Sequence, residues 1–392
     1  MKKTRPYLAR GSSSNSPSRY LKYQVELNRE SELFDEGFDQ REIVQTQFLR
    51  DKTKTLITRN QSPDIGFDRS INPYKGCEHG CIYCFARPTH AYLDLSPGVD
   101  FESQIYYKTG VTSLLEKELN NPNYVCRPIA LGTNTDPYQP GEKDLRVTRE
   151  ILEFLVSRKH PVSIVTKGVL VERDLDLLQK LAAERLVNVN VSITTLSRKL
   201  KNQLEPRTAS PQARLRLVKR LSKKGIPVGV LVAPIITFIN DEEIEQIVGQ
   251  AVDAGAISCS GIMLRLPLEV GPLFEEWLSL HYPLKQARVM SAVRSIRAGK
   301  TNDARWFSRM RGEGPIADMI WARFLRSLKK AGIAYNNMPE LACDKFTIAD
   351  SNGSRPVSYT HLRAHETKAN VVSRLVREKK KGGGGGGGGG GG

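Results

Sequence analysis

Two periods alternate in the pattern of apolar and polar positions along the chain. Short apolar runs rich in β-branched residues predict buried strands. These runs lie at 70–74, 128–134, 161–168, 186–194, 227–235 and 261–268. Apolar residues at helical spacing predict amphipathic helices between them. The helical segments are 111–119, 145–158, 173–184, 210–225, 241–255 and two within 272–299. The segment 210–225 has clear end signals, because Ser210 can cap it, Pro211 opens it and Gly225 ends it.

This alternation of strands and helices predicts an α/β fold with a parallel sheet covered by helices. A closed barrel of this kind takes about eight strand–helix units. Six units therefore predict a partial, TIM-like (β/α)6 barrel that is open on one side. We expect the barrel at 61–300, an N-terminal extension at 21–60 and a helical appendix at 301–354. Functional residues are expected in the loops that follow the strands.

Both ends of the chain have compositions that do not build a core. Residues 1–20 are polar and basic, and we expect them to be disordered. Residues 355–392 end in three lysines and eleven glycines, and we expect a non-native or disordered tail there. The longest apolar stretch, 226–239, is too short to span a membrane.

The net charge of the chain indicates a polyanionic partner. The formal charge is +17, of which +6 comes from residues 355–381, so the rest of the chain carries +11. Such a charge favours nucleic acid as a partner. The predicted appendix adds to this expectation, since guanidinium groups pair with phosphates and aromatic rings stack on bases. Its residues of this kind are Arg305, Trp306, Phe307, Arg309 and Arg311.

Three of the six cysteines fall within eight residues. Cys77, Cys81 and Cys84 have the spacing C-x3-C-x2-C. Thiolates mainly bind zinc, copper(I) and iron–sulfur clusters. A structural zinc site takes four ligands, and His79 or His90 could supply the fourth. A [4Fe–4S] cluster held by three thiolates would instead leave one iron open to a substrate or cofactor.

The other three cysteines, Cys126, Cys259 and Cys343, are isolated in the sequence. They do not form a disulfide framework, and each is expected to be a small buried apolar residue. A thiolate metal site indicates a reducing compartment, the cytoplasm. No apolar run follows the basic N-terminus, so a secretory signal is not expected.

Polar side chains follow several predicted strands. Lys167 at a strand end is a possible counter-charge for a carboxylate or phosphate. Arg207 stands before the helix at 210–225, and an arginine beside a helix N-terminus favours an anion. The full set of strand-end candidates is Thr133, Asn134, Lys167, Ser192, Thr194 and Arg207.

The pattern C-x3-C-x-aromatic-C, with Tyr83 as the aromatic, resembles the cluster motif of the radical S-adenosylmethionine (SAM) superfamily. With the segments 70–92, 135–140 and 204–235, the chain is similar to the spore photoproduct lyase-like branch, also called DNA repair photolyase-like. The resemblance implies an enzyme with a [4Fe–4S] cluster on the three cysteines. It also implies SAM, cleaved reductively to a 5′-deoxyadenosyl radical, and an electron donor such as flavodoxin or ferredoxin.

The resemblance also implies roles for the strand-end residues. Thr133 and Asn134 stand where the family binds the amino group of SAM, Ser192 and Thr194 where hydroxyls could bond the ribose, and Arg207 where a guanidinium could pair with the SAM carboxylate. The lyase keeps a hydrogen-donating cysteine at the end of its second strand. Here that stretch is Gly132-Thr133-Asn134, so photoproduct repair itself is not expected and no catalytic residue is assigned. The alternative is a non-enzymatic zinc or iron–sulfur protein that binds nucleic acid.

Overall fold

The computed structural model describes residues 7, 9–20 and 43–348. The predicted tail at 355–392 lies outside the described residues, as do residues 21–42 of the predicted N-terminal extension.

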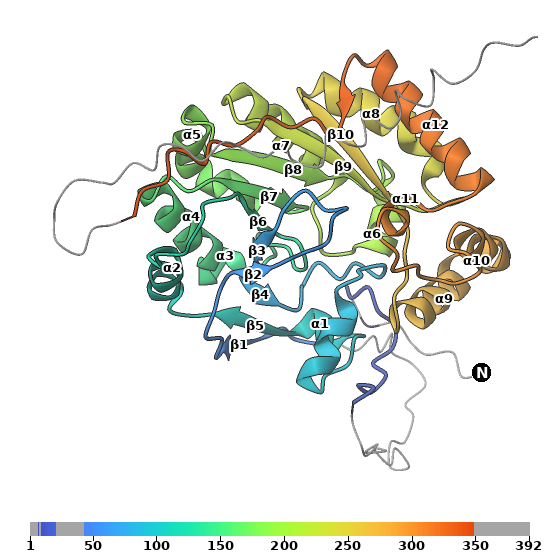
Figure 1. Cartoon of the computed structure of the whole chain (residues 1–392). Helices are drawn as coiled ribbons and strands as arrows, with labels where there is room; N and C mark the ends of the chain where they lie inside the picture. Colours follow the sequence, from blue (N-terminus) through green and yellow to red (C-terminus); the bar gives the residue numbers. More distant parts are fainter. Residues whose placement is uncertain (1–6, 8, 21–42, 349–392) are drawn as a thin grey trace, which may run out of the picture.

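A large sheet of mostly parallel strands forms the centre of the molecule (Figure 1). Its order is β11-β10-β9-β8-β7-β6-β3-β2, with only β2 antiparallel to its neighbour. The bounds are β2 Thr58–Arg59, β3 Arg69–Ile71, β6 Ile129–Leu131, β7 Val162–Thr166, β8 Val187–Ser192, β9 Val228–Ile235, β10 Ser258–Met263 and β11 Ala334–Tyr335. The sheet ends at β2 and β11 without closing on itself. The predicted partial barrel is confirmed.

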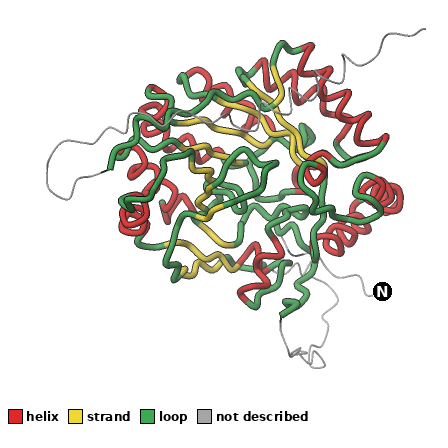
Figure 2. Tube along the Cα trace, in the orientation of Figure 1, coloured by secondary structure: helices red, strands yellow, loops and turns green. Residues whose placement is uncertain are grey.

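Helices cover the outer face of this sheet, as the red segments around the yellow strands show (Figure 2). Valines and isoleucines on both faces of the strands are buried, because helices cover one face and the barrel interior the other. The covering helices are α2 Val111–Leu119, α4 Val147–Ser157, α5 Leu175–Ala183, α7 Pro211–Lys223, α8 Ile244–Asp253 and α12 Pro315–Lys330. The short helices α3 Glu142–Leu145 and α6 Arg198–Leu204 lie in the connections after β6 and β8. Short 3₁₀ turns lie at Val169–Asp174 and Asp241–Glu243.

Helix α7 begins and ends as its sequence signals predict. The Ser210 hydroxyl accepts a hydrogen bond from the Ala213 backbone N–H at 3.2 Å, and Pro211 takes the first helical position. Gly225 follows the helix with φ +72°. These local features fix the helix independently of its packing.

The region predicted as a helical appendix contributes to the same helical layer. Helix α12 packs beside α8, and Arg323 joins them through hydrogen bonds of 2.8 and 2.9 Å to the Glu245 carboxylate. A second apolar cluster lies under α9 Val270–His281 and α10 Gln286–Ser295, which are joined by the 3₁₀ turn Pro283–Lys285. The short helix α11 Ser308–Arg311 lies between these parts.

A small second sheet, not predicted from the sequence, takes one strand from before β2 and two from between β3 and β6. Its order is β1-β5-β4, with bounds β1 Gln47–Asp51, β5 Gln104–Lys108 and β4 Tyr74–Lys75. The 3₁₀ helix Arg87–Leu93 and helix α1 Asp100–Ser103 pack next to it. This sheet holds the start of the cysteine-containing loop.

The disorder predicted for residues 1–20 is wrong for residues 9–20. The backbone N–H groups of Gly11 and Ser12 donate to the Glu102 carboxylate at 2.8 and 2.9 Å. The Arg10 guanidinium donates to the carbonyl oxygens of Glu102 and Val44. Glu102 is fully buried, and a buried carboxylate needs donors. The N-terminal segment supplies them.

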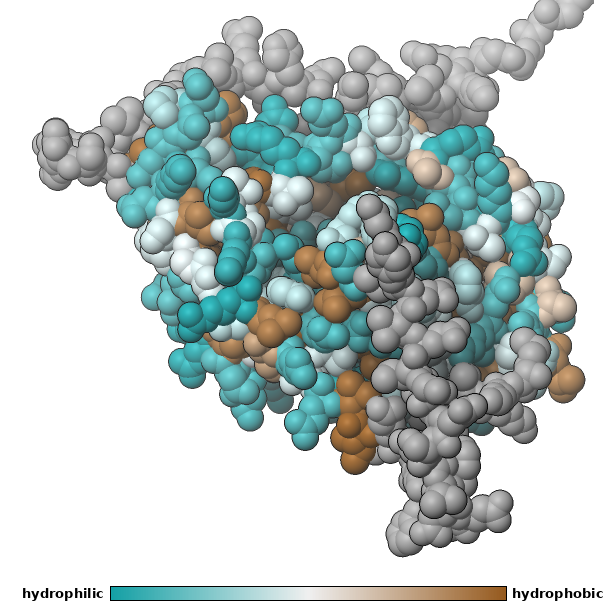
Figure 3. Space-filling model, turned by 90° about the horizontal axis from the view of Figure 1, so that it is seen from below, coloured by the Kyte–Doolittle hydropathy of each residue, from teal (hydrophilic) through white to brown (hydrophobic). Residues whose placement is uncertain are grey.

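The surface seen from below is largely hydrophilic, with hydrophobic side chains in small groups (Figure 3). Among the described residues, no helix is long and apolar enough to cross a membrane.

Candidate active site

The three clustered cysteines lie in the loop that follows β4. The backbone N–H of Cys77 donates to the Phe101 carbonyl at 2.8 Å, and that of Ile82 donates to the Leu204 carbonyl at 3.0 Å. The guanidinium of Arg87, which is fully buried, donates to the Cys81 carbonyl at 2.9 Å. Segments far apart in the sequence therefore fix the path of this loop.

Gly80 allows the close packing behind the loop. Its φ is +67°, a conformation that favours glycine. A Cβ at this position would lie 2.7 Å from the Glu102 carboxylate and 3.2 Å from the backbone of Gly11. The N-terminal segment and Glu102 therefore press directly against the cysteine loop.

Cys77 and Cys81 are buried, Cys84 is half-buried, and the three thiols influence one another electrostatically. Burial raises the pKa of Cys77, and the charges of Asp136 and Cys81 raise it further. Burial and then Glu205 raise the pKa of Cys81, whereas Lys167 and Arg214 act in the opposite direction. Thiols in this setting are held protonated unless a metal ion binds the thiolates and offsets the cost.

The cysteine loop supplies three thiols, a donor type that zinc, copper(I) and iron–sulfur clusters all accept. In the part of the chain that the structure describes, no three Cys, His, Asp or Glu side chains are grouped as ligands of one ion. The nearby histidines have other contacts: His79 Nδ1 lies 3.3 Å from Asp136 Oδ2, and His90 Nε2 lies 3.0 Å from the Gln104 carbonyl.

Four of the residues predicted to contact the cofactor lie close together. They are Tyr83, in the cysteine loop itself, and Lys167, Ser192 and Thr194, at the ends of two strands. Lys167 Nζ, at the end of β7, donates to the Ser192 hydroxyl at 2.6 Å. The same Nζ lies 5.9 Å from the centre of the Tyr83 ring. The Tyr83 hydroxyl lies 3.2 Å from Thr194 Oγ1. The carboxyl ends of β7 and β8 therefore meet the cysteine loop at one place.

A buried ion pair that the sequence did not reveal supports this group. Glu205 accepts a hydrogen bond from the Tyr83 hydroxyl, and its Oε2 lies 3.9 Å from Cys81 Sγ. Arg214 Nη2 donates to Glu205 Oε1 at 2.5 Å. Burial alone would raise the pKa of Glu205, but Arg214 and then Lys167 lower it below its usual range. The carboxylate is therefore ionised.

One feature of the sequence could have indicated Arg214. It lies in the first turn of α7, where the helix dipole disfavours a positive charge. A buried arginine at such a position requires a specific acidic partner, but the sequence does not say which one.

The remaining predicted contacts lie around this group. The Asn134 N–H and the Thr133 hydroxyl, beyond β6, donate to Asn72 Oδ1 at 3.0 and 3.3 Å. Arg207 Nη2 donates to Glu78 Oε1 at 2.9 Å. The guanidinium expected to meet the SAM carboxylate is therefore paired with an acid of the cysteine loop.

Asp136 links the loop after β6 to the end of β7. Its carboxylate accepts hydrogen bonds from the Thr166 hydroxyl at 2.7 Å and from the Lys167 N–H at 2.6 Å. Burial would raise the pKa of Asp136, but His79 and these donors lower it to about 2. This fixed carboxylate holds the backbone of Lys167, and so helps to aim its side chain.

Comparison with known proteins shows what the part of the chain that contains this site is similar to. Residues 71–251 match the sequence model of the radical SAM superfamily. This part of the chain is therefore similar to the radical SAM superfamily over 181 residues. The matched range includes the three cysteines and all the strand-end residues described above.

Two solved structures share the fold of this part of the chain and its surroundings. A mutant of spore photoproduct lyase has a TM-score of 0.52 and 17% identity, and the match covers 72% of this chain and 78% of that chain. Spore photoproduct lyase complexed with dinucleoside spore photoproduct has a TM-score of 0.52 and 16% identity, with 72% and 79% covered. The resemblance to this lyase is confirmed at the level of the fold.

A closer relative by sequence is an uncharacterized protein of Mycobacterium tuberculosis. It is 40% identical over 221 residues, which cover 56% of this chain and 65% of the relative. The match thus spans less than two thirds of that relative's length.

Proposed function

We propose that this protein is a radical SAM enzyme in which Cys77, Cys81 and Cys84 hold a [4Fe–4S] cluster. One observation carries the proposal: three thiols, two buried and one half-buried, share a loop at the carboxyl edge of a parallel sheet, beside polar side chains from two strands. When bound, such a cluster supplies the electron that cleaves SAM to methionine and a 5′-deoxyadenosyl radical.

Each polar side chain beside the cysteine loop has its own role in this proposal. Lys167 provides a positive charge for the SAM carboxylate, since Arg207 is paired with Glu78. Ser192 and Thr194 offer hydroxyls to the ribose. Glu205, held by Arg214, fixes the Tyr83 ring through its phenol and so keeps the loop in one conformation.

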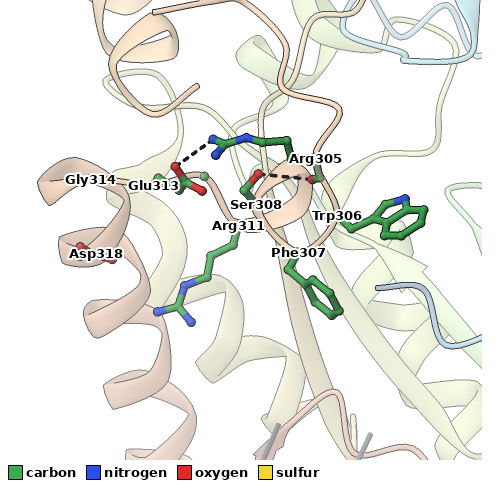
Figure 4. A pocket seen from close by; sticks show the side chains of 9 residues that line it. Arg305, Trp306, Phe307, Ser308, Arg311, Glu313, Gly314 and Asp318 are labelled. Carbon is green, nitrogen blue, oxygen red and sulfur yellow. Dashed lines mark hydrogen bonds and ion pairs between the residues drawn. The ribbon is translucent and has the colours of Figure 1, made fainter. Parts of the chain in front are cut away.

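We further propose that the substrate is a nucleic acid. The loop at 303–312 carries Trp306 and Phe307, which are 58% and 59% exposed. Figure 4 shows both rings projecting away from the backbone of the loop. With Arg305 and Arg311 they line an open cavity of about 500 Å³. Exposed aromatic rings next to guanidinium groups suit unstacked bases and their phosphates.

Two buried contacts hold this loop at the mouth of the barrel. Arg297 donates to the Met263 and Leu264 carbonyls at the end of β10, and to the Ser308 and Arg309 carbonyls at 2.9 Å. The loop therefore lies on the same edge of the sheet as the cysteine loop.

The second contact fixes the backbone of the loop at Phe307. Asp64 accepts hydrogen bonds from the Phe307 N–H at 3.0 Å and from Arg309 at 2.6 and 2.8 Å. Phe307 has φ +68°, a strained conformation for a residue with a side chain. A strained, exposed phenylalanine held by a buried carboxylate supports a binding role for the pair.

Anaerobic reconstitution with iron and sulfide tests the enzyme proposal. We expect about four iron ions per chain and, after reduction with SAM, release of 5′-deoxyadenosine. Replacing Cys77, Cys81 or Cys84 by Ala should abolish both, whereas Cys259→Ala, in β10, should leave both intact. About one zinc per chain with no iron and no 5′-deoxyadenosine would instead support a non-catalytic zinc protein.

A further inference from the structure

The chain after β11 crosses the amino ends of the barrel strands. The N–H of Asn336 donates to the Cys259 carbonyl in β10 at 3.0 Å, that of Ala342 to the Arg185 carbonyl before β8 at 2.9 Å, and that of Thr347 to the Arg158 carbonyl before β7 at 3.0 Å. Figure 1 shows this segment as the orange-to-red trace running from β10 past α5. We call residues 336–348 the C-terminal strap.

The far end of the strap packs against the loop that precedes β6. The Phe346 ring lies 5.7 Å from the Tyr124 ring and 5.2 Å from the His160 ring. Phe346 and Ala342 are buried in the main apolar core. The strap therefore joins the β10 side of the open barrel to the β6 side.

Two cysteines meet where the strap reaches this loop. Cys126 and Cys343 are 217 positions apart in the sequence, yet the contact between the Tyr124 and Phe346 rings brings the two segments that carry them together. Each thiol is the main influence on the pKa of the other. Both are free thiols and both are half-buried. The Arg69 guanidinium acts electrostatically on both sulfurs and donates to the Val125 carbonyl at 2.6 Å.

The two thiols differ in how readily they lose a proton. The Cys126 thiol lowers the pKa of Cys343, and Arg69 acts in the same direction. The Cys343 thiol, and then burial, raise the pKa of Cys126. Cys343 is therefore the more readily ionised thiol, and thiolates are the reactive form.

We propose that Cys126 and Cys343 form a reversible disulfide that fastens the C-terminal strap to the loop before β6. The proposal does not depend on the enzyme function, because both cysteines lie at the amino ends of the strands and the cysteine loop lies at the carboxyl ends. The ligand class is a small-molecule disulfide, such as oxidised glutathione.

The disulfide forms by thiol–disulfide exchange in two steps. The Cys343 thiolate attacks one sulfur of the small disulfide, which forms a mixed disulfide and releases one small thiolate. The Cys126 thiolate then attacks Cys343 Sγ, which forms the Cys126–Cys343 bond and releases the second small thiolate. Two protein thiols lose two electrons, the small disulfide gains them, and the two protein protons leave with the two released thiols.

The disulfide closes a long loop and so restricts the unfolded chain. Such a cross-link should raise the Tm of the oxidised protein by about 5 °C over the reduced protein. It should also slow hydrogen exchange of the backbone amides of Ala342 and Thr347, because opening of the strap would then require breaking a covalent bond.

The test uses the full chain with its reconstituted metal site, treated anaerobically with oxidised glutathione or with dithiothreitol. Peptide mass spectrometry without reduction should find a Cys126–Cys343 linked peptide only in the oxidised sample, and dithiothreitol should remove it. Cys126→Ser and Cys343→Ser should each abolish the linked peptide and the rise in Tm, whereas Cys259→Ser should keep both.

Two results would overturn the proposal. One is glutathione attached to Cys126 or Cys343 with no linked peptide in the wild-type protein. The other is a linked peptide with an unchanged Tm and unchanged exchange of the strap amides, which would mean that the bond does not fasten the strap.

Discussion

Arg214 and Glu205 form an ion pair with an N–O distance of 2.5 Å, and their side chains are only 1% and 0% exposed. The pair contacts the two kinds of group that define the candidate site. Glu205 reaches Cys81 and the Tyr83 hydroxyl, and Arg214 Nη1 donates to the Ser192 carbonyl at the end of β8 at 2.8 Å. It therefore connects the cysteine loop to the end of a barrel strand.

Arg214→Met should destabilise the protein strongly, because it leaves the Glu205 carboxylate buried without its cation. Removal of one partner of a buried pair costs about 3–5 kcal/mol. Urea denaturation of the metal-free protein would measure the free energy of unfolding. The matched control is Arg220→Met in the same helix, because Arg220 pairs with Glu172 at an exposed position. That change should cost less than about 1 kcal/mol. Equal losses for both variants would contradict the assigned role of the buried pair.

Lys167→Met should weaken SAM binding with little effect on folding. The variant removes the ammonium group at the end of β7 but keeps the Lys167 backbone bond to Asp136. A lost charge-assisted contact is worth about 1.5–3 kcal/mol, so the Kd for SAM should rise by about tenfold or more. Equilibrium binding to the reconstituted protein would measure it. Lys180→Met, an exposed change in α5, is the control. An unchanged Kd in Lys167→Met would remove Lys167 from the SAM site.

Trp306→Ala should weaken binding of single-stranded oligonucleotides. Stacking of one base on an aromatic ring is worth about 1–3 kcal/mol, so the Kd should rise about 5- to 100-fold. Fluorescence anisotropy with a labelled oligonucleotide would measure it, and binding to the wild-type protein should weaken as salt is added. Leu284→Ala removes an even more exposed apolar side chain outside the 303–312 loop and should change nothing. Equal affinity for Trp306→Ala and wild type would rule out this stacking site.

The stability contributed by His160 should depend on pH. Its side chain is fully buried, accepts a 2.7 Å hydrogen bond from the Tyr124 hydroxyl at Nε2 and donates from Nδ1 to the Pro161 carbonyl at 3.0 Å. Burial lowers the pKa of His160 from 6.5 to about 4. The unfolded chain therefore binds a proton at a higher pH than the folded protein, and stability present above pH 6.5 is lost as pH falls toward 4.

The difference in free energy of unfolding between wild type and His160→Gln isolates this effect. Relative to His160→Gln, the wild type should lose about 3 kcal/mol of its free energy of unfolding as the pH falls from about 7.5 to about 4. Urea titrations at several pH values would measure it. Parallel curves for the two proteins would show that His160 does not titrate in this way.

The local pattern of the chain determined its regular elements. Helix α2 spans 111–119 as its apolar spacing predicts, and the Ser210 cap opens α7 as expected. The spacing of Cys77, Cys81 and Cys84 likewise indicated a cluster-type thiolate site, since the three lie within one short loop. Each of these features depends on residues a few positions apart in the sequence. Such residues are close in space however the rest of the chain folds.

Only the tertiary structure decided which distant side chains meet. Glu205 beneath Cys81, Glu78 as the partner of Arg207, the sheet β1-β5-β4 and the thiol pair Cys126–Cys343 each join segments from different parts of the sequence. Burial strengthens such polar contacts and makes a buried polar group without a partner costly. Which residue becomes the partner depends on the path of the loops. That path is set by the packing of the whole barrel, and for this reason local sequence patterns do not contain it.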